Sequence, residues 1–402
     1  MPGVLLVGAG RDQRSAIVHA RGLGHRVVVV DDDPNAEGLG RADVAEVADV
    51  GDPAAIEQLA RNHGVAAVLT LARDRAVPTV ALVSERLGLP SIAPDVAHRF
   101  THKLAMRRTL AEEGLPQPAF AAARNLAEGR AAIETVGLPA VLKPVDGERQ
   151  RGVFRIDDPG DLESHLHAAL AESRAREAMV ERLIEGMEMN AVVVARDGAV
   201  RLVTLSDRLR PDGPGFGVAW AHVHPARIHS DQLVAAERTA ERATTALGLR
   251  DGVGIVQLIA GPGGEVSVIG AAGRAPSAPL AELVRHAVGV DLVDVSLRVA
   301  LGQAVPDEIA LPRFSQPVAL RFLTAGPGPL PVGRVTRVGA LGPILAPEGV
   351  VEAETYLSPG TVVAPVRTAD DRHGHVIATG PTTVEALARA DGAAGLLIVE
   401  VE

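Results

Sequence analysis

Continuous apolar runs alternate with helical patterns along the first quarter of the chain. Val4-Leu5-Leu6-Val7 leads into a glycine-rich turn, and Val27-Val28-Val29-Val30 ends on three aspartates. Runs that are apolar at every position are typical of parallel strands buried on both faces. Residues 1 to about 95 are therefore predicted to form a small doubly wound α/β domain.

From about 96 to 305 the pattern changes to helices mixed with β-hairpins. A helix predicted over Thr101–Glu112 is followed by Gly114 and Pro116, the usual order at a helix end. Strand pairs are predicted within 190–205, around Asp197-Gly198, and within 254–269, around Gly263-Gly264. The remainder, 306–402, is rich in proline and glycine with short strands, and it predicts a β-rich C-terminal domain.

Composition excludes several classes of function. The 402 residues carry a net charge of −10 without a basic block, which argues against a nucleic-acid partner. The chain has no cysteine, so disulfides and thiolate metal sites are excluded. No apolar run approaches the roughly 20 residues that span a bilayer, and the N-terminus lacks the features of a signal peptide. We therefore expect no membrane partner and a cytoplasmic location.

Three motifs occur in a fixed order through the middle of the chain. Thr101-His102-Lys103 precedes Gly114-Leu115-Pro116, Leu142-Lys143-Pro144 ends a predicted strand, and a third motif runs from Val180 to Glu188. Together they resemble the ATP-grasp superfamily, most of all bacterial L-amino-acid ligases, which are carboxylate–amine ligases. Biotin carboxylase is a more distant likeness. The tail, with Gly360–Pro365 and Asp371–Gly380, resembles that of the amino-acid ligases.

The resemblance implies an α/β fold of ATP-grasp architecture. Residues 1–95 would be the N-terminal doubly wound domain. Residues 96–305 would be a two-lobed α+β ATP-grasp domain with a lid at about 140–205, and 306–402 would be the β-rich C-terminal domain.

The same resemblance assigns a nucleotide site, with ATP as the expected cofactor. Lys103 and Lys143 would contact phosphates, Glu181 and Leu183 would flank adenine, and Glu188 would bind the ribose hydroxyls. A lysine at the end of a strand suits a phosphate as a point charge, and a carboxylate accepts two hydroxyl donors well. The alternative for each is an ordinary solvated or structural residue.

The family's magnesium ligands are absent from the matching positions. The family has a carboxylate on the first strand of the last hairpin and a Glu-x-Asn-x-Arg set on the second. Here Gln257 takes the first position, Gly270 and Ala272 take the next two, and Arg274 remains. Magnesium prefers hard oxygen ligands, usually carboxylates, so these substitutions argue against magnesium binding.

The phosphate loop differs from the family as well. Residues 146–152 keep glycines near both ends but insert Glu148, Arg149 and Gln150 between them. The loop is predicted to be flexible and solvated, with anion binding by Arg149 and Arg151 as the alternative.

Candidate substrate contacts stand in the segment 216–226. Trp220, His222 and His224 occupy alternate positions, and alternate residues of a strand share a face. They are candidates for contact with a small molecule, together with Arg274, the candidate catalytic residue, which could grip a substrate carboxylate bidentately. The alternatives are a metal pair or ordinary surface histidines.

Two functional hypotheses remain open. In the first, the protein is an ATP-dependent ligase that joins an amino acid or another carboxylate to an amine through an acyl phosphate, with an unusual metal arrangement. In the second, it is a degenerate ligase, either a divergent enzyme or a non-catalytic binding or regulatory partner. The family also suggests a homodimer.

Overall fold

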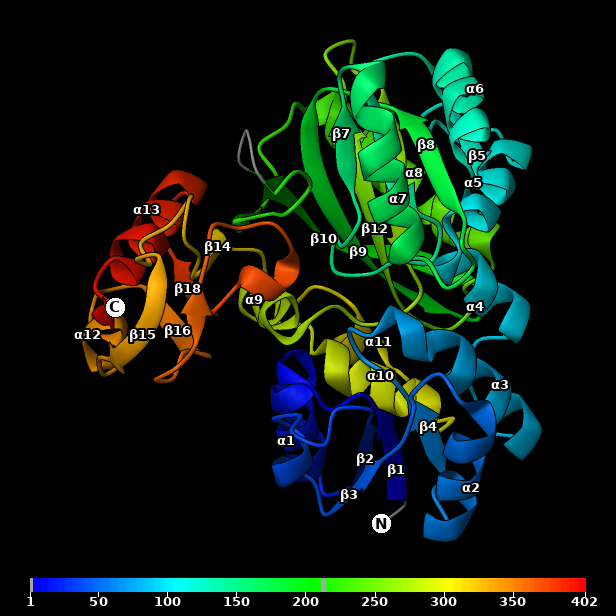
Figure 1. The fold of residues 1–402 in the computed structure, drawn as a ribbon. Coiled ribbons are helices and arrows are strands. Elements are labelled where there is room, and N and C mark those ends of the chain that lie inside the picture. The colour runs from blue at the N-terminus through cyan, green and yellow to red at the C-terminus, as the bar shows by residue number, and fades with distance from the viewer. Residues whose placement is uncertain (1–2, 211–214) are drawn as a thin grey trace.

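The N-terminal part of the chain forms a parallel sheet of four strands in the order β3-β2-β1-β4, drawn in blue in Figure 1. The structure is a computed structural model that describes residues 3–210 and 215–402. The apolar runs alternate between two cores. Leu5 and Val28 pack toward α2 and α3, while Val4 and Val27 pack toward α1 and toward two later helices, α9 (Ala278–Val288) and α10 (Leu292–Ala300). The elements are β1 Gly3–Val7, α1 Arg14–Gly22, β2 Arg26–Asp31, β3 Val44–Val47, α2 Pro53–His63, β4 Ala67–Leu69 and α3 Val77–Leu87, with 3-10 turns at Arg11–Gln13, Leu39–Arg41 and Asp74–Ala76.

The helix predicted over Thr101–Glu112 begins two residues later. The backbone of His102 is extended, and its Nδ1 accepts a hydrogen bond from the Ala105 amide. The histidine therefore caps α5, Lys103–Glu112, and separates it from α4, Pro94–Thr101. This break makes Lys103 the first residue of its helix.

A small lobe follows, built on an antiparallel sheet in the order β5-β8-β6-β7 with two helices packed on it. Its sheet begins at residue 120 and ends at 182, whereas the lid was expected at about 140–205. The expected range therefore takes residues from two different sheets. The elements are β5 Phe120–Ala123, α6 Leu126–Val136, β6 Ala140–Pro144, β7 Phe154–Ile156, a 3-10 turn at Pro159–Asp161, α7 Leu162–Ala171 and β8 Ala178–Arg182.

The large sheet has eight strands in the order β13-β12-β9-β10-β11-β14-β18-β16. Both predicted hairpins are present, and the first turns at Asp197 and Gly198 with φ of 51° and 82°. The sheet crosses the expected domain boundary at 306, because β11 pairs with β14. Its elements are β9 Met187–Arg196, β10 Ala199–Leu209, β11 Ala221–His224, α8 Ser230–Leu247, β12 Gly252–Ala260, β13 Val266–Ala272, β14 Val318–Phe322, β16 Val350–Thr355 and β18 Gly374–Thr379.

Helices α9 and α10 lie at the meeting point of all parts of the molecule (Figure 1). One apolar core combines their residues with those of β1, α1, β9 and β14. No helix in the described parts of the chain is long and apolar enough to cross a membrane. The remaining elements are α9 Ala278–Val288, α10 Leu292–Ala300, α11 Asp307–Ala310, β15 Gly333–Val338, α12 Gly342–Leu345, β17 Val362–Val363, a 3-10 turn at Ala369–Asp371, α13 Thr383–Ala394 and β19 Val399–Val401, with β17, β15 and β19 forming a third antiparallel sheet.

The loop at 146–152 is tied to both neighbouring domains, which corrects the expectation of a flexible, solvated loop. The Arg149 guanidinium forms ion pairs with Asp12 of the N-terminal domain and Asp370 of the C-terminal domain. Burial lowers the pKa of Arg149, but the charges of Asp12 and Asp370 outweigh it and raise that pKa above its usual range. The Arg149 carbonyl also accepts the Ala369 amide at 3.0 Å. The sequence could not show this, because the partners lie more than 130 residues away.

The backbone of this loop is held in an unfavourable conformation. Arg149 and Gln150 have φ of 59° and 63°, and the left-handed region costs a residue with a side chain about 1 kcal/mol or more. The ion pairs with Asp12 and Asp370 offset that cost.

We expect Arg149→Ala to release the loop. Amide hydrogen exchange at 146–152 and at Ala369 should accelerate roughly tenfold, as expected for a loss of about 1.4 kcal/mol of local stability. Arg337→Ala, which removes an exposed ion pair to Glu400, is the control and should leave this exchange unchanged. Equal exchange in wild type and Arg149→Ala would show that the ion pairs do not hold the loop.

Candidate functional site

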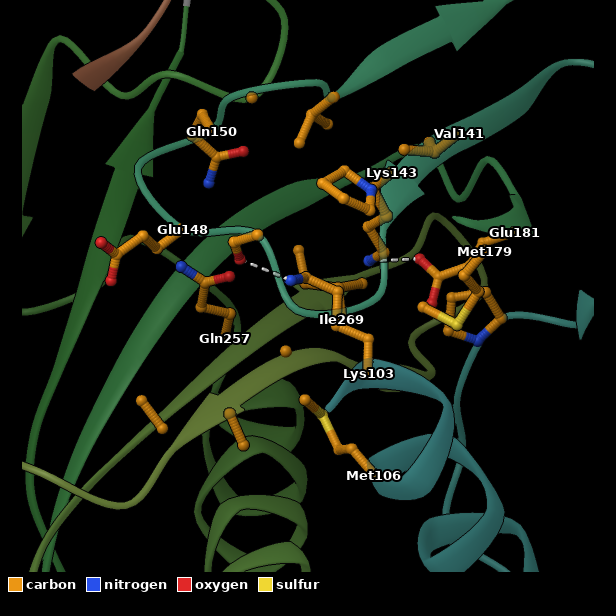
Figure 2. A pocket seen from close by; sticks show the side chains of 18 of the residues that line it. Lys103, Met106, Val141, Lys143, Glu148, Gln150, Met179, Glu181, Gln257 and Ile269 are labelled. Atoms are coloured by element: carbon orange, nitrogen blue, oxygen red, sulfur yellow. Dashed lines mark hydrogen bonds and ion pairs between the residues drawn. The ribbon is translucent and has the colours of Figure 1, made fainter. Parts of the chain in front are cut away.

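A cavity lies between the small lobe and the large sheet, and the loop at 146–152 runs along it (Figure 2). The lining comes from α5, β6, β8, β9, β12 and β13. Six of the predicted ATP-site and catalytic residues line it together: Lys103, Lys143, Glu181, Leu183, Glu188 and Arg274. Their assigned roles stay predictions.

The centre of the cavity wall is a buried charge triad. Glu181 Oε1 accepts from Arg107 Nε at 2.5 Å, and Glu181 Oε2 lies 2.5 Å from Lys143 Nζ (Figure 2). Burial alone would raise the pKa of Glu181, but the charges of Arg107 and Lys143 outweigh it and lower that pKa. The Glu181 side chain thus forms ion pairs with two cations. Arg107 also donates to the carbonyls of Val268 and Ile269, so it joins α5 and β8 to β13.

Lys103 is held by a backbone carbonyl. Its Nζ donates to the Gly147 oxygen at 2.7 Å. Burial, followed by the positive charge of Lys143, lowers the pKa of Lys103 to about 8. Burial also lowers the pKa of Lys143. Two buried ammonium groups whose charged forms are disfavoured by burial favour an anionic ligand beside them.

Glu188 is bound on both carboxylate oxygens. Arg208 Nη1 lies 2.5 Å from Oε2, and Arg210 Nε lies 2.6 Å from Oε1. A ribose would therefore share an already neutralised carboxylate. Leu183 lines the cavity, and its amide donates to the Pro139 carbonyl at 3.0 Å.

The floor of the cavity is made of residues of the last hairpin. Gln257 on β12 lies directly opposite Gly270 on β13, and Ala272 and Arg274 follow on the same face. The neighbours Val256 and Leu258 face the other way, into the core with α8. A side chain added at position 270 would begin 2.9 Å from Gln257 Oε1. The metal positions inferred from the sequence thus share one surface, and that surface carries an amide in place of carboxylates.

Arg274 connects the floor to the N-terminal domain. Its Nε donates to Asp74 Oδ1 at 2.6 Å. Asp74 stands in the 3-10 turn before α3, and the Arg274 charge lowers the pKa of Asp74 against the opposing effect of burial. A substrate carboxylate at Arg274 would compete with Asp74.

The predicted substrate residues lie apart from the lining of this cavity. Trp220 lies under the Arg321 guanidinium, 4.6 Å from the ring centre. His222 is buried beside Asn190, and burial followed by the charges of Arg208 and Arg372 lowers its pKa well below the usual value. His224 contacts the Leu205 carbonyl. Their contact with a substrate stays a prediction.

Sequence reasoning missed the arginines that organise the site. Arg107 and Arg208 are buried and each neutralises a cavity carboxylate. Arg107 had a local signal, since it follows Lys103 by one helical turn and so shares its face. Arg208 had no local signal in the sequence, because the pairing of β9 with β10 is what brings it close to Glu188.

Comparisons with known proteins agree with this architecture. Residues 108–268 match the model of the ATP-grasp domain, and residues 322–402 match that of the L-amino acid ligase C-terminal domain 2. The L-amino acid ligase from Bacillus licheniformis has a similar fold, with a TM-score of 0.85, 19% identity, and coverage of 100% of this chain and 99% of that one.

Two curated proteins are similar over much of the sequence. Formate-dependent phosphoribosylglycinamide formyltransferase of Synechococcus sp. (strain RCC307) is 28% identical, over 99% of this chain and 97% of that protein. Uncharacterized protein y4rH of Sinorhizobium fredii is 27% identical over 81% of this chain, and the match spans 66% of that protein, just under two thirds. With the two matched domains, these likenesses show that the chain has the ATP-grasp architecture and that its C-terminal part matches the C-terminal domain 2 of L-amino acid ligases.

Proposed function

We propose that this protein is a divergent ATP-grasp ligase that binds a nucleotide in its cleft and has lost the magnesium-dependent formation of an acyl phosphate. The observation that carries the proposal is the cavity floor, where Gln257, Gly270 and Ala272 take the positions of the metal ligands. Magnesium requires near-octahedral coordination by hard oxygens, usually with one or two carboxylates. Glycine and alanine side chains offer no donor atom, and the amide of Gln257 carries no charge.

The other carboxylates of the cavity do not replace the missing donors. Glu181 and Glu188 each face two cations, Asp74 pairs with Arg274, and Glu148 accepts the Arg75 amide. Drawing Glu181, Glu188 or Asp74 to a metal would take a partner from a cation in or beside the cavity, which costs up to several kcal/mol for a buried pair. Drawing Glu148 would break its hydrogen bond with the Arg75 amide. The residues present therefore do not fit a magnesium ion of the kind that the family uses, and we derive no metal-dependent step.

Binding of an anion is supported by the two lysines. Burial lowers the pKa of both lysines, and the charge of Lys143 lowers that of Lys103 further, so a phosphate group beside them would offset part of the cost of burying two positive charges. The matched ATP-grasp domain makes a nucleotide the expected source of that phosphate. Two further expectations stay proposals with this one, a homodimer and a cytoplasmic location.

We expect ATP affinity to be independent of magnesium, because no carboxylate stands ready for the ion. Calorimetric titrations with and without magnesium should give dissociation constants within about twofold, and no amino acid should elicit phosphate release. Magnesium-dependent binding with turnover would overturn the proposal in favour of an active ligase with an unusual metal site. Absence of nucleotide binding at millimolar concentration would overturn the nucleotide part.

The triple variant Gln257→Glu, Gly270→Glu, Ala272→Asn should create magnesium dependence, strengthening ATP binding at least about tenfold when the ion is present. The matched control is Gly270→Gln with Ala272→Asn, which fills the same space without adding carboxylates. The control should show no response to magnesium. An equal response in both variants would show that bulk at the floor, and not charge, matters.

We expect nucleotide affinity to fall as pH rises above about 8. Lys103 is charged below its pKa of about 8 and neutral above it, and bound phosphate raises that pKa, so affinity is full below pH 8 and declines above it by up to about tenfold per pH unit for each lysine that titrates. The nucleotide phosphate itself titrates near pH 6 and stays ionised in this range. The Lys103→Arg variant keeps its positive charge throughout this range. The slope of the logarithm of affinity against pH should therefore fall by about one, and any slope that remains comes from Lys143. An unchanged slope would exclude Lys103 as a phosphate contact.

A further inference from the structure

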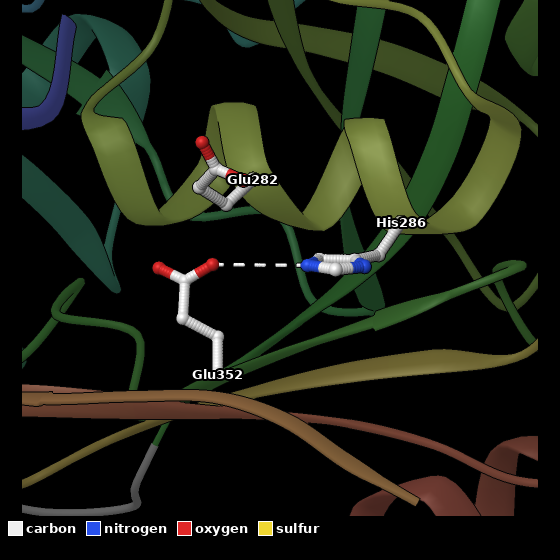
Figure 3. Close-up of side chains that lie close together, drawn as sticks. All are labelled: Glu282, His286 and Glu352. Atoms are coloured by element: carbon white, nitrogen blue, oxygen red, sulfur yellow. Dashed lines mark ion pairs between the residues drawn. The ribbon is translucent and has the colours of Figure 1, made fainter. Parts of the chain in front are cut away.

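A second group of chemically active side chains lies outside the cleft, where α9 faces the C-terminal sheet. Glu282 and His286 are four residues apart on α9 and so share one face of the helix. Glu352 reaches toward them from β16 (Figure 3). The three ligating atoms all lie within 4.8 Å of one another. It is the one such group among residues 3–210 and 215–402.

The spacing of these atoms suits a transition metal. In a tetrahedral zinc site with bonds of about 2.0–2.2 Å, neighbouring ligand atoms stand about 3.3–3.6 Å apart. His286 Nε2 and Glu352 Oε2 are 3.7 Å apart, so a small side-chain movement brings them to bonding distance. A mixed imidazole and carboxylate set suits zinc better than magnesium or calcium.

A second histidine, His375, orients the carboxylate of Glu352. His375 Nε2 lies 3.1 Å from Oε1, which leaves Oε2 facing His286. The Tyr356 hydroxyl lies 3.4 Å from His375 Nδ1, and His375 is buried. Outer partners of this kind orient metal ligands in known sites.

A cation from the protein lies beside these groups. Arg285 donates to Glu282 Oε2 at 2.6 Å, and its Nη2 lies 3.3 Å from His286 Nε2. Arg285 is about half exposed, at 47% of its side-chain surface, so it can move into solvent when another cation binds. The arrangement therefore attracts positive charge, and Arg285 is its competitor.

We propose that Glu282, His286 and Glu352 form a zinc site that joins α9 to the C-terminal sheet. The site lies outside the cleft lining, and it stands whether or not the cleft binds nucleotide. Its effect is structural, because the three ligands come from two elements on opposite sides of a domain contact, and a metal that binds only the folded chain stabilises it.

The test is a zinc chloride titration of the full chain after chelator treatment, by calorimetry and by thermal unfolding. We expect one saturable site per chain at micromolar concentration and a rise in Tm. Glu282→Gln and His286→Ala should each weaken binding at least about tenfold. Arg285→Ala should strengthen it by about tenfold, because it frees Glu282 and removes a neighbouring positive charge.

His63→Ala is the matched control. His63 pairs with Glu46 at 2.8 Å in the N-terminal domain, and no third ligand completes a group there among the described residues. This control should bind zinc as the wild type does. Equal losses in His63→Ala and His286→Ala, no saturable binding by the wild type, or weaker binding by Arg285→Ala would each overturn the proposal. If His286→Ala does not fold, the zinc affinities of Glu282→Gln and Arg285→Ala still test the proposal.

Discussion

Neutralisation of buried charge is the constraint on which the cleft depends. Arg107 is almost fully buried, and its guanidinium binds Glu181 and two carbonyls of β13. Removing one partner of such a pair leaves an uncompensated charge and costs roughly 3–5 kcal/mol. Glu181 in turn holds Lys143. The small lobe, α5 and the floor of the cavity are thus fixed relative to one another by one chain of charges, whatever the cleft binds.

The same principle explains the altered phosphate loop. A glycine-rich loop would leave backbone amides free for phosphate oxygens. Here Arg149 forms ion pairs with Asp12 and Asp370, and these two ion pairs link the small lobe to both terminal domains. These ion pairs hold the loop against both neighbouring domains. In the function that we propose, the floor without carboxylates and the tied loop are two separate features of one cleft, and both would reduce its capacity for phosphoryl transfer.

The proposed zinc site would place metal binding outside the cleft. One face of helix α9 packs in the central apolar core, and the opposite face carries Glu282 and His286. A metal there would act on domain docking, since Glu352 belongs to the C-terminal sheet.

The sequence by itself determined the elements whose signal is local. Apolar runs predicted the parallel sheet, the Asp197-Gly198 turn predicted its hairpin, and the motifs around Lys103 and Lys143 predicted residues that line one cavity. Only the tertiary structure decided the charge partners and domain limits. Ion pairs such as Arg149 with Asp370 join residues far apart in the chain, and the continuous large sheet depends on pairing between β11 and β14. Such contacts leave no periodic trace in the sequence, because side-chain pattern records burial and turn chemistry but not the identity of a distant partner.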